Sequence, residues 1–261
     1  LVSAEAVAGA VQFGISQLPS EAAALVPAIQ AADFSGMTTC GGLLTAAAGG
    51  FGGDLLLKEV QSRVLAVLRM AEALSPKYHV VVANPPYMGG KGMNDVLSDM
   101  LKSTYPNSKY DLFAAFIERA HALNIERAFS ALVTMESWMF ISRYEKFRSN
   151  FFDRSAIQSM VHMPYLGKGG TSMGINFGTT AFVTEKARKE NYPGNYQCIR
   201  YYECDDFGVP IAFPVENERT ATTTTADFES LPGTPVVYWC SEQVKDLFSR
   251  ASPVSEYAET R

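Results

Sequence analysis

The sequence predicts an α/β protein with a mostly parallel sheet, an antiparallel hairpin at one edge of that sheet, and a helical segment before it. Two observations predict this fold class. Apolar residues recur at helical spacing in the first 75 residues, and from residue 78 onward short β-branched runs alternate with amphipathic stretches. The chain has 261 residues, of which 47% are hydrophobic, and the 16 Phe and 12 Tyr exclude a disordered chain.

The N-terminal region, residues 1–76, is expected to be a helical insertion. Ser20 can cap one helix, and Asp54 can cap a second whose apolar stripe is ended by Pro76. A Gly-rich stretch at 49–53 precedes the second helix. We interpret it as a loop, because no β-branched strand leads into it.

The region 77–190 carries the strand signals. Helices are expected over 111–124, with Phe116 on its apolar face, and over 142–152. The first two strands are separated by a helix, and the last two are not. This spacing predicts parallel neighbours followed by an edge hairpin. The expected strands are 78–83, 129–134, 157–162 and 179–184.

The region 191–261 is polar and turn-rich. It predicts one strand at 236–239 and a helix at 241–250. We expect it to be the start of a target-recognition or C-terminal region.

Charge and cysteine content narrow the class of protein. The formal net charge of −5 argues against a generally basic nucleic-acid binder, but residues 141–190 carry 8 basic and 4 acidic side chains. Contact of this stretch with phosphate and an ordinary solvated helix face both remain open. The basic residues concerned are Arg143, Lys146, Arg148 and Arg154.

The four cysteines include no CxxC pair, which favours a reducing, cytoplasmic compartment. No apolar run reaches the roughly 18 residues of a membrane span, so no membrane partner is expected. The three histidines show no mutual ligand spacing, so no metal site is expected.

The most informative motif is Asn84-Pro85-Pro86-Tyr87, directly after the first predicted strand. The carboxyl end of such a strand is where α/β sheets place ligands. The two prolines restrict the backbone, so the Asn84 side chain and the Pro85 carbonyl become two acceptors at a fixed separation. Tyr87 then presents a flat ring beside them.

This arrangement suits an amino group on a planar ring. Two acceptors that take both hydrogens localise the nitrogen lone pair, and the help is positional and electrostatic. A base that stacks on Tyr87 gains about 1–3 kcal/mol. A base from a duplex must first be flipped out, at a cost of about a few kcal/mol.

With this motif the chain resembles the gamma-type N6-adenine DNA methyltransferases, and most of all the PglX-type methyltransferases of BREX phage-defence systems. The resemblance covers residues 78–185 strongly and 230–250 loosely. Four stretches carry it: Val81 to Gly89, Lys109 to Glu118, Glu136 to Phe140, and Gly174 to Thr180.

The resemblance implies a Rossmann-like class I methyltransferase sheet, S-adenosyl-L-methionine as cofactor, double-stranded DNA as substrate, and a phage-defence or restriction-modification context with further defence-system subunits as partners. It implies that Asn84 and Pro85 accept from the adenine amino group, with Pro86 as part of the catalytic motif. It also implies that Tyr87 and Phe177 take the two faces of the flipped base, and that Phe116 touches the cofactor's adenine. Ordinary core packing would equally explain Phe116 and Phe177.

One departure from the family keeps other functions open. The family's main cofactor motif, a Gly-containing turn after its first strand, is absent from this chain. A non-catalytic recognition or assembly fragment is therefore one alternative. Methylation of protein glutamine or of RNA guanine, which also uses this motif, is another.

Overall fold

The computed structural model describes residues 73–164, 177–206, 209–214 and 217–250, together with Ser62, Arg63, Leu65, Ala66, Arg69 and Met70. The chain divides into two compact units, Leu1–Lys77 and Tyr78–Arg261. In the first unit, the described residues between 62 and 74 are helical. The helix expected after Ser20 and the stretch 49–53 lie outside the described residues.

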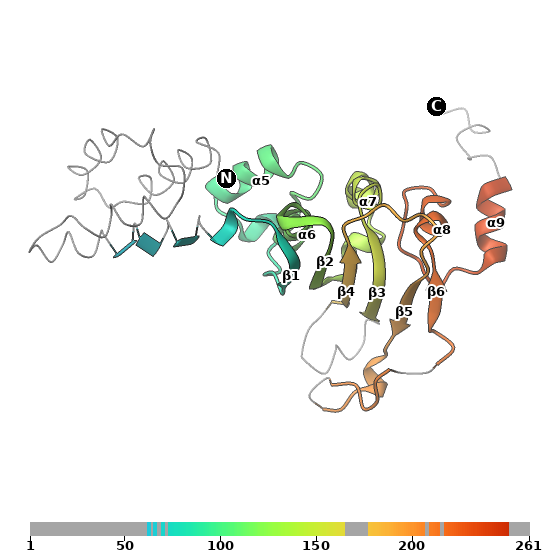
Figure 1. Cartoon of the computed structure of the whole chain (residues 1–261). Helices are drawn as coiled ribbons and strands as arrows, with labels where there is room; N and C mark the ends of the chain where they lie inside the picture. Colours follow the sequence, from blue (N-terminus) through green and yellow to red (C-terminus); the bar gives the residue numbers. More distant parts are fainter. Residues whose placement is uncertain are drawn as a thin grey trace, which may run out of the picture. The chain divides into compact units, whose positions relative to one another are not determined.

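The second unit is built on one six-stranded sheet with the strand order β1-β2-β4-β3-β5-β6 (Figure 1). β1 is parallel to β2, and β3 is parallel to β5, whereas β4 is antiparallel to both of its neighbours and β6 is antiparallel to β5. The carboxyl ends of β1, β2, β3 and β5 therefore share one edge of the sheet. The strands are β1 (Tyr78–Ala83), β2 (Asn124–Met135), β3 (Ala156–Met163), β4 (Thr179–Glu185), β5 (Gly194–Cys198) and β6 (Ala221–Thr223).

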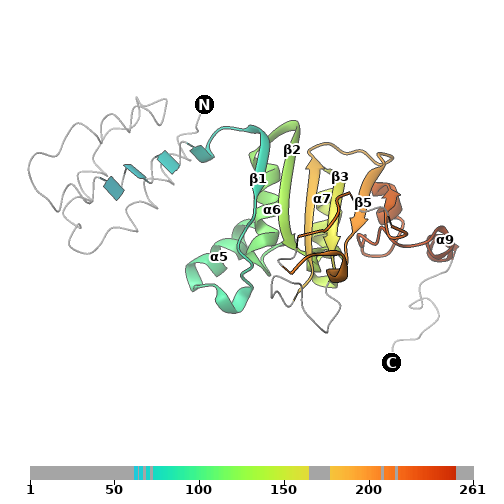
Figure 2. The same cartoon turned by 90° about the horizontal axis from the view of Figure 1, so that it is seen from below.

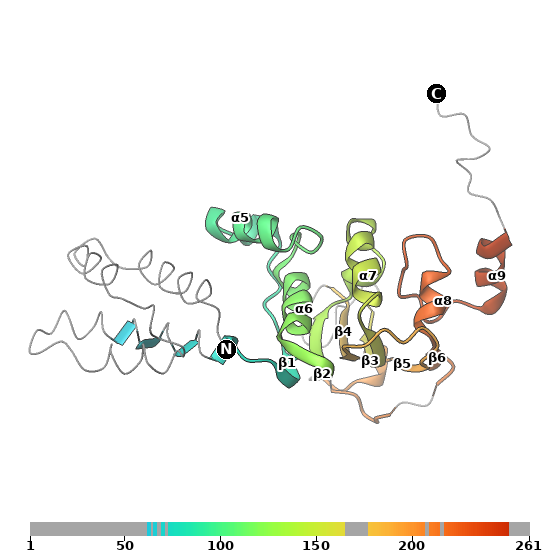
Figure 3. The same cartoon turned by 45° about the horizontal axis from the view of Figure 1, so that its top comes forward.

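Helices cover one face of this sheet. Figures 2 and 3 show α6 (Leu112–Leu123) and α7 (Glu145–Phe152) on the same side of the strands, and Figure 3 shows α8 (Thr225–Glu229) continuing the row. The core between the helices and the sheet is largely aromatic. The remaining helical elements are α5 (Asp95–Thr104), α9 (Glu242–Arg250), and the 3-10 turns Gly90–Gly92, Glu136–Met139, Ser142–Tyr144 and Tyr201–Glu203. Among the aromatic side chains of the core are Phe113, Trp138, Tyr144, Phe147, Phe151, Phe152, Phe182, Tyr196 and Phe228.

The opposite face of the sheet is apolar where β1 and β2 lie side by side. Val80 pairs with Phe129, and Val82 is 75% exposed. Val133 and Phe129 are also exposed within the part of the chain that the structure describes. Since side chains alternate along a strand, the buried residues of β2 face α6 and α7, and these four face the other way.

The α/β class and the first four predicted strands are confirmed, and the strand expected at 78–83 is β1. The placement of the hairpin is wrong. β4 lies between β2 and β3, and β5 and β6 continue the sheet beyond the hairpin. The reason is that β4 pairs with β2 over its full length, from Thr179 to Glu185, and so occupies the centre.

Two further expectations on the C-terminal region had different outcomes. The helix expected at 241–250 is α9. The strand expected at 236–239 is wrong, because this segment forms a turn in which the Val236 N–H donates to the Met139 carbonyl. The segment is thereby attached to the end of β2 rather than to the edge of the sheet.

Arg148 holds this C-terminal turn to α7. The side chain is 2% exposed. Its guanidinium donates to the Gly233, Thr234, Trp138 and Ile141 carbonyls at 2.6–3.0 Å. Thr234 has a φ of 51°, a left-handed conformation that is costly for a β-branched residue. Arg148 therefore stabilises a strained turn by saturating its carbonyls.

We predict that Arg148→Ala lowers the free energy of unfolding by about 2–4 kcal/mol, because buried carbonyl groups lose their donors. Lys146→Ala, at an exposed position of the same helix, should change it by less than about 0.5 kcal/mol. Urea denaturation of the two variants gives both values. Equal stability of the two variants would contradict this role of Arg148.

Candidate active site at the carboxyl edge of the sheet

The corner Asn84–Tyr87 follows directly after β1, at the carboxyl edge of the sheet. Pro85 is buried, while Asn84 and Pro86 are exposed. Neither the Asn84 side chain nor the Pro85 carbonyl makes a hydrogen bond to any residue that the structure describes. The corner therefore holds two hydrogen-bond acceptors without a partner among the described residues, on a backbone that is fixed by proline and by burial.

Tyr87 is half-buried between two phenylalanines. Its ring centroid lies 6.2 Å from that of Phe113 and 5.2 Å from that of Phe177, and both pairs are edge-to-face. Burial raises the pKa of the Tyr87 hydroxyl above its ordinary value, so the phenol is neutral at physiological pH. The predicted site residues Tyr87 and Phe177 thus lie in contact.

The Tyr87 and Phe177 rings are not parallel, so they do not enclose a space for a base between their faces. Their planes make an angle of 84°. A base held between two parallel rings needs a centroid separation of about 7 Å, twice the ~3.5 Å contact distance of carbon atoms. Phe177 can take the second face of a base only if its ring turns relative to Tyr87.

Asp111 positions the corner from the start of α6. Its Oδ1 accepts from the Met88 N–H at 3.0 Å and from the Phe113 N–H at 3.3 Å. The Leu112 N–H in turn donates to the Met88 carbonyl at 3.0 Å. One carboxylate therefore caps α6 and fastens the residue after Tyr87 to the helix that carries Phe113. The pattern of an acidic residue just before an apolar helical stripe is a signal for this role.

Phe116 does not face the core, contrary to its predicted place on the apolar face of the helix. Phe113 and Ile117 are buried, whereas Phe116 is 38% exposed and makes no ring contact with a described aromatic residue. The predicted contact of Phe116 with the cofactor stays a prediction.

A second group of hydrogen-bonded side chains lies further along the same edge. His162, at the end of β3, bonds Glu136 Oε2 through Nε2 at 2.6 Å and Tyr238 Oη through Nδ1 at 2.9 Å. The Glu136 N–H donates to the Gly178 carbonyl, and the Glu136 carboxylate fills the space that a Cβ on Gly178 would occupy. Sequence analysis missed this network, although Glu136 directly follows β2.

The four basic residues singled out in the sequence differ in exposure. Arg148 is buried, so both sequence interpretations of it are wrong. Arg143 is exposed, and its guanidinium lies 5.7 Å from the centroid of the Tyr110 ring. The Lys109 ammonium lies at the same distance from that ring. Lys146 and Arg154 are exposed.

No group of three or more His, Cys, Asp or Glu side chains in the described ranges could hold a metal ion. No helix in them is long and apolar enough to cross a membrane.

The protein is therefore an α/β protein with an Asn-Pro-Pro-Tyr corner at the carboxyl edge of its sheet. Known proteins to which the chain is similar are methyltransferases. Residues 57–167 match the family model of the Eco57I restriction-modification methylase. The chain is similar to the adenine-specific methyltransferase BrxX of Escherichia coli O9:H4 (strain HS), with 36% identity over 72% of this chain and 15% of that protein. The adenine-specific methyltransferase PglX of Lacticaseibacillus casei (strain Zhang) is 32% identical over 71% of this chain and 16% of that protein.

The resemblance to N6-adenine methyltransferases is thus confirmed over most of the chain. The chain spans about one sixth of the length of these relatives. Among solved structures, the DrdV–DNA complex aligns with a TM-score of 0.47 and 15% identity, over 72% of this chain and 20% of that chain.

We predict that Asp111→Ala destabilises the fold by about 1–2 kcal/mol, as expected for a lost helix cap. Asp111→Asn should cost less than about 0.5 kcal/mol, since an amide oxygen can accept the same two bonds. Burial raises the pKa of Asp111, and backbone hydrogen bonds offset part of the rise. The folded state therefore binds this proton more tightly than the unfolded state does. That extra stability is present below the ordinary pKa of about 3.9 and is lost as pH rises through the raised pKa.

Denaturation midpoints of the wild type and Asp111→Asn, measured across this pH window, provide the check. As pH falls, the denaturation midpoint of the wild type should rise relative to that of Asp111→Asn. The opposite trend would contradict the burial effect.

Proposed function

We propose that the Asn84–Tyr87 corner holds the N6 amino group of adenine for methylation, as part of a site-specific DNA adenine methyltransferase in a phage-defence or restriction-modification context. The observation that carries this proposal is the pair of acceptors, the Asn84 side chain and the Pro85 carbonyl, with no hydrogen bond to a described residue beside a half-buried tyrosine. The names of the relatives, adenine-specific methyltransferases, support the choice of substrate base.

The two acceptors change the reactivity of the amino group. In free adenine the N6 lone pair is delocalised into the ring, so the nitrogen is a poor nucleophile. When Asn84 Oδ1 and the Pro85 carbonyl each accept one hydrogen, they favour a pyramidal nitrogen with a localised lone pair. The methyl group would come from the sulfonium of the cofactor, whose carbon–sulfur bond breaks to leave a neutral thioether. The exposed Asn84 side chain leaves the displaced N6 proton a path to water.

Tyr87 holds the base in place. Phe113 packs against Tyr87 from the core side, and Asp111 fastens Met88, so the ring is ordered before the base arrives. A base that stacks on an ordered ring loses less free energy to side-chain ordering. Phe177 completes the base site by turning toward the second face of the base.

The described residues fit part of a cofactor site. S-adenosyl-L-methionine, when bound, supplies the methyl group. Phe116 presents a 38% exposed ring without an aromatic partner in the described part, and this suits contact with the cofactor's adenine. The main cofactor motif of the family is absent from this chain, so we assign no further cofactor contact.

In the full-length protein that contains this chain, Asn84→Ala should lower the rate of adenine methylation by about 10²–10³-fold, the usual effect of removing one preorganised polar group. Asn150→Ala, the same change at an exposed position of α7, should leave the rate within about twofold. Mass spectrometry of N6-methyladenine in substrate DNA measures both. A normal rate for Asn84→Ala would refute the role assigned to Asn84.

Tyr87→Ala should weaken binding of DNA that carries an extruded adenine by about 5–100-fold, and Tyr87→Phe should retain most of the affinity, because the ring and not the hydroxyl stacks. Fluorescence anisotropy with a labelled duplex carrying a mismatched adenine measures the affinity. Equal losses in both variants would show that the hydroxyl, rather than stacking, holds the base.

The same enzyme preparation tests whether DNA, RNA or protein is the methyl acceptor. A labelled methyl group offered with DNA, RNA and protein should appear in DNA alone. Label on protein glutamine or on RNA guanine would replace the present proposal, and no label on any polymer would favour a recognition or assembly role.

A further inference from the structure

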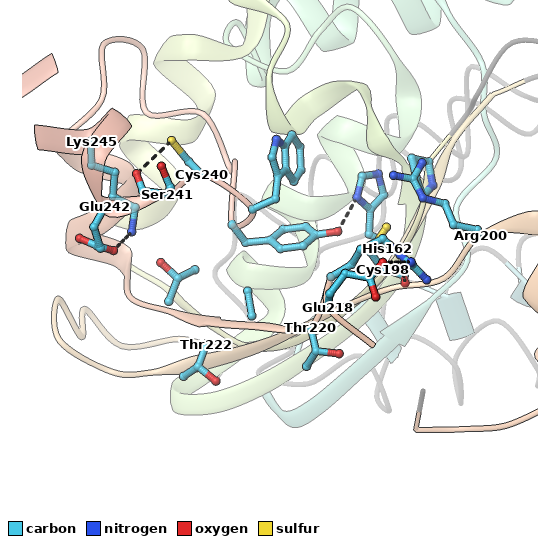
Figure 4. Close-up of a pocket in the computed structure, with 16 residues that line it drawn as sticks. His162, Cys198, Arg200, Glu218, Thr220, Thr222, Cys240, Ser241, Glu242 and Lys245 are labelled. Carbon is cyan, nitrogen blue, oxygen red and sulfur yellow. Dashed lines mark hydrogen bonds and ion pairs between the residues drawn. The ribbon is translucent and has the colours of Figure 1, made fainter. Parts of the chain in front are cut away.

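A pocket separate from the Asn84–Tyr87 corner lies on the same edge of the sheet; we call it the second pocket. It encloses about 560 Å³ at the carboxyl ends of β3 and β5 and beside β6. Figure 4 shows His162 and Arg200 on one side of it, with Glu242 and Lys245 on the other. None of the residues assigned above to the base or the cofactor lines this pocket.

The pocket contains a large aromatic ring that is exposed and yet held in place. Trp239 is 52% exposed. Its ring stacks on His162 with an interplanar angle of 26° and a centroid distance of 5.9 Å, and Tyr238 contacts it edge-on at 4.9 Å.

The support beneath Trp239 is itself fixed. Both ring nitrogens of His162 are hydrogen-bonded, one to Glu136 and one to Tyr238, and the His162 side chain is buried. An ordered, half-exposed tryptophan offers a stacking surface at low cost in side-chain entropy. Nucleobases stack on such rings irrespective of sequence.

Of the three described Lys and Arg residues that line the pocket, Arg200 is the one without an ion pair, although its charge acts on the Glu203 carboxylate. Arg219 is paired with Glu203 and Glu218, and Lys245 with Asp227 and Glu242. The Arg200 backbone N–H donates to Glu203, but the Arg200 guanidinium makes no hydrogen bond or ion pair to a residue within the described ranges. One guanidinium and one exposed aromatic ring in the same pocket suit a single phosphate attached to a single base.

The distance between the Asn84–Tyr87 corner and this pocket is short enough for one DNA molecule to contact both. β3 and β5 run parallel to β1 and are its third and fourth neighbours in the sheet. At about 4.8 Å per strand, the pocket lies about 14–19 Å along the carboxyl edge from the corner. This is about half of the ~34 Å helical turn of B-DNA, so a duplex along this edge would meet both sites.

We propose that this pocket binds a second nucleotide of the DNA substrate, with its base stacked on Trp239 and its phosphate on Arg200. The identity of the ligand rests on the proposed function, since it takes DNA as the substrate. The site itself requires no methyl transfer, so it can be tested separately.

The test uses the intrinsic fluorescence of the chain, which has only two tryptophans. Trp138 is fully buried and Trp239 is half-exposed, so a stacked base should quench Trp239 alone. Titration with deoxythymidine 5′-monophosphate should give saturable quenching that Trp239→Phe abolishes. Arg200→Ala should raise the half-saturating concentration about 10-fold for the monophosphate and leave that for deoxythymidine unchanged.

Asn84→Ala is the matched control. It should leave the quenching of this chain intact, whereas in the full-length protein it should lower methyl transfer by about 10²–10³-fold. Failure of one proposal is therefore distinguishable from failure of the other. Absence of saturable quenching, or quenching that survives in Trp239→Phe, would overturn the pocket proposal. Quenching by S-adenosyl-L-methionine without quenching by the monophosphate would also overturn it and would indicate a cofactor site.

Discussion

The contact between Asp111 and the Met88 N–H is the interaction on which the candidate site depends. β1 brings the corner to the edge of the sheet, but a strand end alone leaves the following residues without backbone partners. The carboxylate that caps α6 also accepts the Met88 N–H, so the position of Tyr87 is set by the helix as well as by the strand. The same helix supplies Phe113, which packs against Tyr87. Capping, packing and the orientation of the ring therefore have one common cause.

The His162 network plays the corresponding part further along the edge. It connects the end of β2, through Glu136, with the end of β3 and with the turn that carries Tyr238 and Trp239. The same Glu136 carboxylate lies where a side chain at position 178 would be, next to Phe177. This half-buried carboxylate thus lies against Gly178, the residue after Phe177, and bonds His162, the support of Trp239. Glu136 therefore connects the backbone next to Phe177 with the pocket, because its N–H donates to the Gly178 carbonyl and its carboxylate bonds His162.

Local signals accounted for much of the fold. The β-branched run at 78–83, the proline corner after it and the amphipathic helix that starts at Asp111 are each readable within about a dozen residues. Strand order is not local: only the pairing of β4 with β2 places it in the centre of the sheet. Burial of charge is not local either. Arg148 has the sequence context of an exposed basic face, and it is buried because carbonyls some 85 residues later need its donors. Phe116 fits a helical apolar stripe, yet it is 38% exposed, whereas Phe113 and Ile117 of the same helix are buried.

If this chain binds DNA as proposed, the distribution of its charges determines how much electrostatic attraction and how much stacking contribute to the affinity. The chain is acidic, and the cations near the second pocket are mostly paired with carboxylates, as Arg219 and Lys245 show. Arg148 serves the fold instead of the surface. Binding that relies on phosphate neutralisation needs several free cations, and each one adds to the salt dependence of the affinity. Here aromatic rings stand out at both sites, Tyr87 with Phe177 at the corner and Trp239 in the pocket. Affinity from this region would therefore come mainly from stacking of unpaired bases and only weakly from the backbone charge of the duplex. Such a surface favours DNA whose bases have left the helix, which is the state that chemistry at an exocyclic amino group requires.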